Sequence, residues 1–173
     1  IKGIAMAALA AWAVESGMKV TGSDVEESFP SDAVLAEKQI PVRIGFSPDH
    51  IDHPDLVVYT GAHGGRDNVE VVEAIRRGIP GLPHGKALGV AMQGKRQVSV
   101  AGSHGKTTTT AMIATILTVA GLDPSYAVGC GPITGFGLSG HKGAGDVFVA
   151  EADEYITEPG HDTTPRFLWQ KPE

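Results

Sequence analysis

Apolar and polar positions alternate along this chain in blocks that predict helices separated by short strands. Residues 4–16 are rich in alanine and other strong helix formers, and Gly17 follows them as a natural stop. Val69, Val72 and Ile75 recur at helical spacing, so residues 69–77 are expected to form another helix. Similar signals predict helices over residues 31–38, 86–92 and 107–120, with Ser31 and Asn68 as N-caps of the helices that follow them.

Short runs of apolar and β-branched residues predict the strands. The clearest are 56–59, 98–101 and 147–150, and the weaker ones are 19–21, 42–44 and a strand approach at 166–169. Strands that alternate with helices are typical of α/β proteins with a parallel sheet. The polar connector at 93–96 predicts a boundary between two domains, residues 1–94 and 95–173, of which the first has a Rossmann-like outline.

Composition excludes several classes of protein. The chain has 42% hydrophobic and 20% charged residues, as an ordinary globular protein has, and its net charge of -6 argues against non-specific binding to nucleic acid or anionic membranes. No apolar run approaches the roughly 20 residues that a membrane span needs. The single cysteine, Cys130, excludes an internal disulfide framework and suits a reducing cytoplasm. Because the chain opens on Ile1 in a turn and stops after a strand approach, we expect it to be an internal piece of a longer protein.

The strongest chemical signal is Gly102-Ser-His-Gly-Lys-Thr-Thr108, set between a predicted strand and a predicted helix. The glycines let backbone N–H groups turn toward phosphate oxygens, and the helix N-terminus adds its positive dipole. Lys106 supplies a mobile charge for the β- and γ-phosphates, and Thr107 offers a hydroxyl to Mg²⁺. The strict Walker pattern needs a glycine where Val100 stands, so the loop is a shortened variant. The alternative is a glycine-rich turn with a coincidental lysine.

A carboxylate should complete the magnesium site from a neighbouring strand. Glu151 follows the strand predicted at 147–150, and ligands gather at the carboxyl ends of parallel strands. Asp153 and Glu154 are rivals; strand alternation would place Glu151 and Asp153 on one face and Glu154 on the other. A solvated acidic strand end explains the same residues without a metal.

The first glycine turn, residues 1–5, leads into a helix, and Asp24 ends the next strand about 20 residues later. This is the outline of a nucleotide-binding βαβ unit with an acid placed for a ribose hydroxyl. The third glycine position holds Ala5, and a structural turn explains the residues equally well. Residues 60–65 also end a strand in glycines, and either a second anion site or a plain turn fits them.

Three further candidates carry weaker signals. His50, Asp52 and His53 could form a metal cluster, but a polar loop before a strand is the favoured interpretation. Cys130 has no Cys or His partner at ligand spacing and is expected to be a small buried residue. His104 is the only histidine that we place near chemistry.

Two motifs together resemble the signatures of the Mur ligase family. Gly102-Ser-His-Gly-Lys-Thr-Thr-Thr109 is similar to that family's phosphate loop, and Phe148-Val-Ala-Glu-Ala-Asp-Glu154 to its second-strand motif. Residues 1–6, 21–24 and 66–70 resemble the N-terminal domain of the branch that acts on UDP-N-acetylmuramate. The order and spacing match over nearly the whole chain.

The resemblance implies a cytoplasmic enzyme of peptidoglycan synthesis in which ATP phosphorylates the lactyl carboxylate of UDP-N-acetylmuramate and an amino group then forms an amide. It implies Lys106 and Glu151 as catalytic residues, and Thr107 and Glu151 as ligands of Mg²⁺. It assigns ATP binding to Gly102, Ser103, His104, Gly105, Lys106, Thr107 and Thr108. It assigns the UDP part to Ile1, Lys2, Gly3, Ile4, Ala5, Asp24, Thr60, Gly61 and Ala62.

Departures from the family pattern leave alternatives open. Ser103 replaces a threonine, Ala5 replaces a glycine, and Tyr155 stands where ligases that add L-alanine have serine. Tyrosine there is more like the branch member that recycles murein tripeptide. The hypotheses are L-alanine addition, tripeptide addition and a non-catalytic nucleotide-binding module. A dinucleotide-dependent dehydrogenase is a further option, but the Lys-Thr-Thr loop serves no purpose in hydride transfer. Because the family's amino-acid-binding third domain is absent from this sequence, we expect the piece alone to be inactive.

Overall fold

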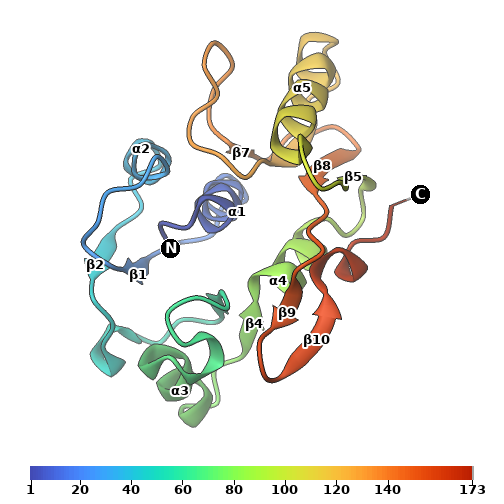
Figure 1. Cartoon of the computed structure of the whole chain (residues 1–173). Coiled ribbons are helices and arrows are strands. Elements are labelled where there is room, and N and C mark those ends of the chain that lie inside the picture. The colour runs from blue at the N-terminus through green and yellow to red at the C-terminus, as the bar shows by residue number, and fades with distance from the viewer. Residues whose placement is uncertain (173) are drawn as a thin grey trace.

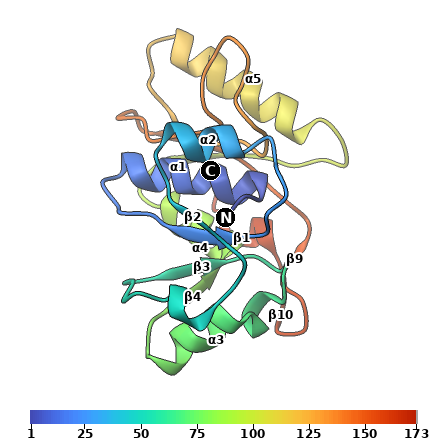
Figure 2. The same ribbon diagram turned by 90° about the vertical axis from the view of Figure 1, so that its left-hand side faces the viewer.

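The computed structural model describes residues 1–172 and has the mixed α/β architecture that the sequence predicts. Parallel strand pairs alternate with helices, and α3 (Val69–Arg76) and α5 (Lys106–Val119) lie at opposite ends of the molecule, with α1 (Ile4–Glu15) between them (Figures 1 and 2). Within the described residues, no helix is both long and apolar enough to span a membrane.

The N-terminal half contains two parallel strand pairs. β1 (Gly22–Asp24) pairs with β2 (Val42–Ile44), and β3 (Val57–Tyr59) pairs with β4 (Gly81–Pro83). The remaining elements of this half are α2 (Asp32–Glu37), α4 (His84–Ala91) and the short 3₁₀ helices η1 (Pro48–His50) and η2 (Gly65–Asp67).

A four-stranded sheet in the order β5-β8-β6-β7 forms the C-terminal half. β5 (Arg96–Val100), β8 (Val147–Glu151) and β6 (Ser125–Ala127) are parallel, and β7 (Gly140–His141) closes the edge in the antiparallel direction. An antiparallel hairpin of β9 (Ile156–Glu158) and β10 (Asp162–Pro165) follows, and then the 3₁₀ helix η3 (Arg166–Trp169).

One buried cluster joins the two halves. It contains Ala8 and Leu9 of α1, Ala87 and Leu88 of α4 with Met92 just beyond it, and Ala127, Phe148 and Ala150 of β6 and β8. Small residues on α1 let the helix approach the sheet closely, and Trp12 adds an aromatic contact to Phe148 at 6.0 Å between ring centroids. The predicted ranges 1–94 and 95–173 therefore share core packing.

Several predicted elements are confirmed and some are wrong. Asn68 caps α3 through its side chain, which accepts from the N–H of Glu70. The strand predicted at 19–21 instead forms at β1, because pairing starts where Gly22 N donates to Pro41 O, and proline has no N–H to extend the ladder backwards. Ser31 occupies the N-cap position of α2 as predicted, but its hydroxyl donates to Lys2 O and makes no capping hydrogen bond to the helix.

The strand approach expected at 166–169 is also wrong, because this segment is the 3₁₀ helix η3. The N–H groups of Arg166 and Phe167 donate to Tyr155 O and Asp153 O instead of to a neighbouring strand. Strands β4, β6, β7, β9 and β10 were not predicted, and each is four residues or shorter.

Two glycines of α4 let η3 lie directly against this helix. Gly85 and Gly89 are four residues apart and share a helix face. A Cβ at Gly89 would lie 2.5 Å from Trp169 O, whereas one at Gly85 would meet mainly the flexible side chain of Arg166, at 3.1 Å from Cγ. Lys86, on the same helix, reaches Asp162 at 2.9 Å and lies 4.5 Å from the centre of the Trp169 ring. The C-terminal hairpin and η3 are thereby fixed to α4 (Figure 1).

Gly89→Ala is expected to lower the free energy of unfolding by about 1–3 kcal/mol, because the new methyl group overlaps backbone that cannot move independently. Urea unfolding of the chain measures this change. Gly85→Ala is the matched control: its neighbour is a movable side chain, and alanine's better helix propensity, about 1 kcal/mol, offsets the contact. Equal stability of the two variants would contradict this packing.

Candidate functional site

The pairing of β5 with β8 brings the phosphate loop and the acidic motif to the same edge of the sheet. Val100, the last residue of β5, pairs with Glu151, the last residue of β8. The loop follows β5 and turns into α5 at Gly105, whose φ of 77° lies in the left-handed region that favours glycine. The first N–H groups of α5 therefore point at the space beyond the sheet edge, as at an anion-binding helix N-terminus.

The side chains at the start of α5 face the acidic motif. Lys106 Nζ donates to Gly102 O at 2.8 Å and to Glu154 Oε2 at 3.4 Å. Thr107 Oγ1 donates to Glu151 Oε2 at 3.2 Å, and the other carboxylate oxygen of Glu151 accepts from Gly129 N at 2.7 Å. The structure thus brings Lys106, the Thr107 hydroxyl and the Glu151 carboxylate to the same edge of the sheet, as the sequence predicts.

Among the three acidic candidates, Glu151 has the position that suits a magnesium ligand. Its carboxylate accepts a hydrogen bond from Thr107, whereas Glu154 contacts Lys106. Asp153 lines the same cavity as Thr107 and Glu151. Residues 1–172 contain no cluster of three or more His, Cys, Asp or Glu side chains suited to a metal. A threonine hydroxyl and one carboxylate fit Mg²⁺, because this ion keeps several waters and is usually completed by substrate phosphates.

The first turn of α1 is held by Asp24. Asp24 Oδ2 accepts from Lys2 N at 2.6 Å and from the nitrogen of Ile1 at 2.7 Å, and Oδ1 accepts from Val25 N at 2.8 Å. Burial alone would raise the pKa of Asp24, but these hydrogen bonds, with the positive charge of the Ile1 ammonium, outweigh it and hold the pKa below its ordinary value. The side chain of Lys2 turns away and donates to Glu27 O.

The loop after β3 also approaches Asp24. It does so with His63, a residue that the sequence interpretation did not select as functional. His63 Nε2 lies 3.6 Å from Asp24 Oδ1, and its ring packs in a tilted arrangement against Phe46, with 5.2 Å between the ring centroids. Thr60 Oγ1 accepts from Ala62 N at 2.9 Å and so shapes the turn. The structure therefore brings His63, which follows residues 60–62, beside Asp24. The backbone of His63 has a left-handed φ of 52°, which the sequence does not reveal.

A cavity of about 210 Å³ connects the two glycine turns. Ile4 and Ala5 of α1 line one end, and Thr107 and Glu151 line the other. The other lining residues are Ala8, His84, Leu88, Ala127, Gly129 and Asp153. Residues from α1, α4, α5 and the sheet thus enclose one mainly apolar space, into which His84, Thr107, Glu151 and Asp153 bring polar groups.

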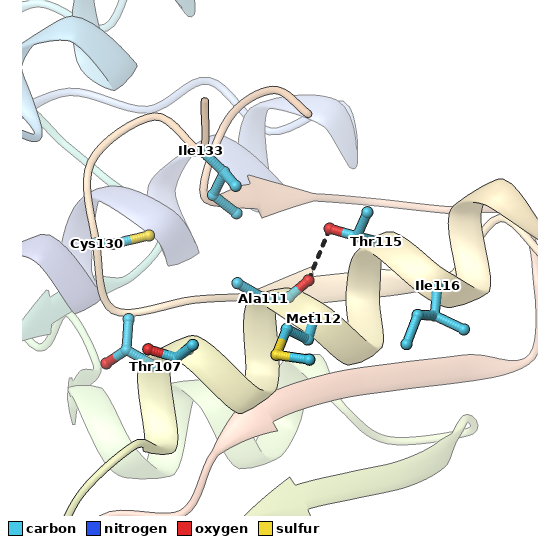
Figure 3. Close-up of a pocket in the computed structure, with 8 residues that line it drawn as sticks. Thr107, Ala111, Met112, Thr115, Ile116, Cys130 and Ile133 are labelled. Carbon is cyan, nitrogen blue, oxygen red and sulfur yellow. Dashed lines mark hydrogen bonds between the residues drawn. The ribbon is translucent and has the colours of Figure 1, made fainter. Parts of the chain in front are cut away.

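A larger hollow of about 470 Å³ lies along α5 (Figure 3). Apart from threonines at 107, 108 and 115, its lining is apolar, with Ala111, Met112, Ile116, Cys130 and Ile133 around it, and the Thr115 hydroxyl is already bonded to Ala111 O at 2.8 Å. Because it offers no charged group, we place the chemistry in the smaller cavity.

The weaker sequence candidates have structural explanations. His50 Nδ1 lies 2.7 Å from Glu70 Oε1 and 3.0 Å from Ser23 Oγ, so it links three elements. Asp52 and His53 are exposed, and the favoured interpretation of a polar loop agrees with this placement. Cys130 is half-buried, and burial followed by the charge of Glu151 raises the pKa of its thiol.

A glycine loop at the start of a helix, on the carboxyl edge of a parallel sheet, is typical of α/β proteins that bind phosphate groups. A model described as "Mur ligase family, catalytic domain" matches residues 1–96, more than half of the chain. The chain belongs to the Mur ligase family.

Curated relatives and solved structures agree with this membership. UDP-N-acetylmuramate--L-alanine ligase of Salinispora tropica is 43% identical over 152 residues, 88% of this chain and 29% of that protein. The ligase of the same name from Aquifex aeolicus is 42% identical over 154 residues, 89% of this chain and 33% of that protein. The chain spans about a third of the length of these relatives.

Two solved structures have the same fold over most of the chain. A murein peptide ligase of Psychrobacter arcticus has a TM-score of 0.84 at 30% identity, over 99% of this chain and 40% of that one. The UDP-N-acetylmuramate-alanine ligase of Thermotoga maritima has a TM-score of 0.76 at 35% identity, over 90% of this chain and 36% of that one. The predicted Rossmann-like and phosphate-loop architecture is confirmed by these likenesses.

The depressed pKa of Asp24 predicts a pH-dependent contribution to stability. A carboxylate whose pKa is lower in the folded state stabilises the fold above its unfolded pKa, about 3.9, and loses this effect as the pH falls. Asp24→Asn should therefore lower the free energy of unfolding by about 1–2 kcal/mol at neutral pH. The deficit should shrink below pH about 4.

Urea unfolding of both proteins between pH 7 and pH 3 measures this difference. The exposed Asp52 provides the control, since Asp52→Asn should leave stability unchanged at every pH. A deficit for Asp24→Asn that stays constant down to pH 3 would show that the charge of Asp24 is not what stabilises the turn.

Proposed function

We propose that this chain supplies the UDP-substrate-binding and ATP-binding parts of a ligase that joins L-alanine to UDP-N-acetylmuramate in peptidoglycan precursor synthesis. The observation that carries the proposal is the cavity that joins the first turn of α1 to Thr107 and Glu151. A UDP-sugar held at the turn would extend its sugar toward the phosphate loop through this space. The names of the relatives from Salinispora tropica and Aquifex aeolicus support the same reaction.

On the ATP side, residues 102–108 hold the phosphates, and Lys106 contacts the phosphoryl group that is transferred. Lys106 Nζ donates a hydrogen bond to Gly102 O in the same loop, so the lysine side chain already points into the loop. Thr107 and Glu151 hold Mg²⁺, which when bound neutralises charge on the phosphate oxygens. The contact of Thr107 with Glu151 supports this pairing, since both oxygens face one point.

On the substrate side, residues 1–5 and 60–62 with Asp24 face the UDP group. Residues 1–94 form the substrate-binding part and residues 95–173 the ATP-binding part of this proposal. The lactyl carboxylate takes the γ-phosphoryl group from ATP, which leaves as ADP. An amino group then attacks the acyl carbon, and an amide, inorganic phosphate and a proton result.

The apolar sides of the cavity serve this chemistry. An acyl phosphate is hydrolysed if water reaches it, and a site that excludes water prevents this side reaction. Ala8, Leu88 and Ala127 line the cavity and are at most 8% exposed. We therefore propose that these side chains keep water away from the activated carboxyl group. The reaction belongs in the cytoplasm, where ATP is available and a lone cysteine stays reduced.

A tripeptide acceptor is the second candidate, favoured by Tyr155. This side chain is 64% exposed, and the guanidinium of Arg166 lies 6.0 Å from the centre of its ring. Among the solved structures named above, the peptide ligase of Psychrobacter arcticus is 30% identical to this chain and the UDP-N-acetylmuramate-alanine ligase of Thermotoga maritima is 35% identical. L-alanine therefore remains our first proposal.

The full-length protein with ATP and UDP-N-acetylmuramate tests both candidates. We expect phosphate release that depends on L-alanine and exceeds that with the tripeptide L-alanyl-γ-D-glutamyl-meso-diaminopimelate. The reverse preference would select the peptide ligase. Release with neither amine would leave only a non-catalytic nucleotide-binding role.

Lys106→Ala should lower ATP turnover by a factor of about 100 or more, because a charge that contacts the transferred group is lost. Binding of UDP-N-acetylmuramate, measured by calorimetry, should stay nearly unchanged. Lys19→Ala is the matched control, since Lys19 is exposed and far from the loop in sequence. Equal loss of turnover and of UDP-sugar binding would count against two separate sites.

A further inference from the structure

His84 is a buried histidine in the wall of the cavity, and neither the sequence motifs nor the proposed reaction uses it. It is the first residue of α4, is 7% exposed and lines the space between Ala5 and Glu151. Its Nε2 atom lies 3.2 Å from Ala5 O, in the first turn of α1. The side chain therefore connects α4 to the turn that faces the UDP group in our proposal.

The partner of Nε2 fixes the tautomer of the ring. A carbonyl oxygen only accepts, so Nε2 carries the hydrogen and donates it to Ala5 O. Burial, and secondarily the charge of Arg166, lower the pKa of His84 to about 4, against the opposing effect of the Ala5 hydrogen bond. At neutral pH the ring is uncharged, and Nδ1 is left with a free lone pair.

This lone pair has no partner within residues 1–172. The one hydrogen bond recorded for the His84 side chain is that of Nε2, and Nδ1 is not among the fully buried polar atoms that lack a partner. Nδ1 therefore keeps some exposed surface, and His84 lines the cavity. At the far end of the same cavity both Glu151 oxygens already accept hydrogen bonds, from Thr107 and Gly129.

We propose that His84 is a substrate-binding residue whose Nδ1 accepts a hydrogen bond from an uncharged N–H or O–H group on the sugar part of the UDP-sugar. The inference rests on the proposed function, since it takes the UDP group to lie at the first turn of α1. The imidazole ring of His84 is hydrogen-bonded to Ala5 and so lies at the UDP end of the cavity. The sugar must pass this point to reach the phosphate loop. An acetamido N–H or a ring hydroxyl has the required chemistry.

Two substitutions of His84 distinguish the role of Nδ1 from that of Nε2. In His84→Gln the amide nitrogen reaches the position of Nε2 and keeps a donor for Ala5 O, but the acceptor at Nδ1 is lost. In His84→Asn the amide group lies near Nδ1 and supplies an acceptor oxygen, but the donor to Ala5 O is lost. The first variant should lose recognition of the sugar and the second should lose stability.

Calorimetry on the full-length protein with UDP and with UDP-N-acetylmuramate tests this expectation. His84→Gln should weaken UDP-N-acetylmuramate about fivefold, as expected for one hydrogen bond, and leave UDP unchanged. His84→Asn should keep the ratio of the two affinities. An unchanged ratio in His84→Gln would overturn the inference while both ligands still bind, whereas no binding of either ligand by the unaltered protein would defeat the proposed function itself.

NMR of the unaltered protein labelled with ¹⁵N-histidine gives an answer that does not depend on the folding of any variant. The His84 signals should be those of the neutral Nε2–H tautomer. The Nδ1 signal should shift on addition of UDP-N-acetylmuramate and not on addition of UDP. A shift of equal size with both ligands, or a shift only when L-alanine is added, would overturn the assignment to the sugar.

Discussion

The parallel, in-register pairing of β5 with β8 is the constraint on which the proposed ATP site depends. It sets Val100 opposite Glu151, and Ala152 N extends the ladder with a bond to Val100 O at 2.9 Å. The loop that follows β5 and the acid that ends β8 must then emerge at one edge. A third segment reaches this edge from β6, which also pairs with β8. The chain after β6 carries Gly129, whose N–H donates to the Glu151 carboxylate and orients it. Three segments far apart in sequence thus converge through backbone hydrogen bonds.

Helix α1 imposes the second constraint. Its buried face consists mainly of alanine, so the helix fits between the β1–β2 pair and the four-stranded sheet. The same helix begins at the turn that Asp24 holds. α1 packs against β6 and β7, and its Trp12 contacts Phe148 of β8. This packing fixes the first turn relative to the phosphate loop, and the cavity lies between them.

Sequence reasoning predicted the parts whose signals are local. The phosphate loop, the helix capped by Asn68 and the strand at 42–44 depend on residues close together in sequence, and the structure has them as predicted. The strand β4 was missed because glycine and proline at 81 and 83 indicate a turn, yet parallel pairing with β3 makes it a strand. His63 and His84 were missed because their surroundings are set by tertiary contacts alone.

The contacts of Asp24 sharpen what the first turn requires. A carboxylate offers about four lone-pair sites, and in Asp24 the nitrogens of Ile1, Lys2 and Val25 use three of them. Through these hydrogen bonds Asp24 fixes the backbone of the turn, in addition to any contact with UDP in the proposed function. Ala5 itself lies within α1, whose helical backbone alanine favours, so this position does not require the conformational freedom of a glycine. The carbonyl of Ala5 is used as well, since it holds the ring of His84, and so the same residue connects the turn to the wall of the cavity.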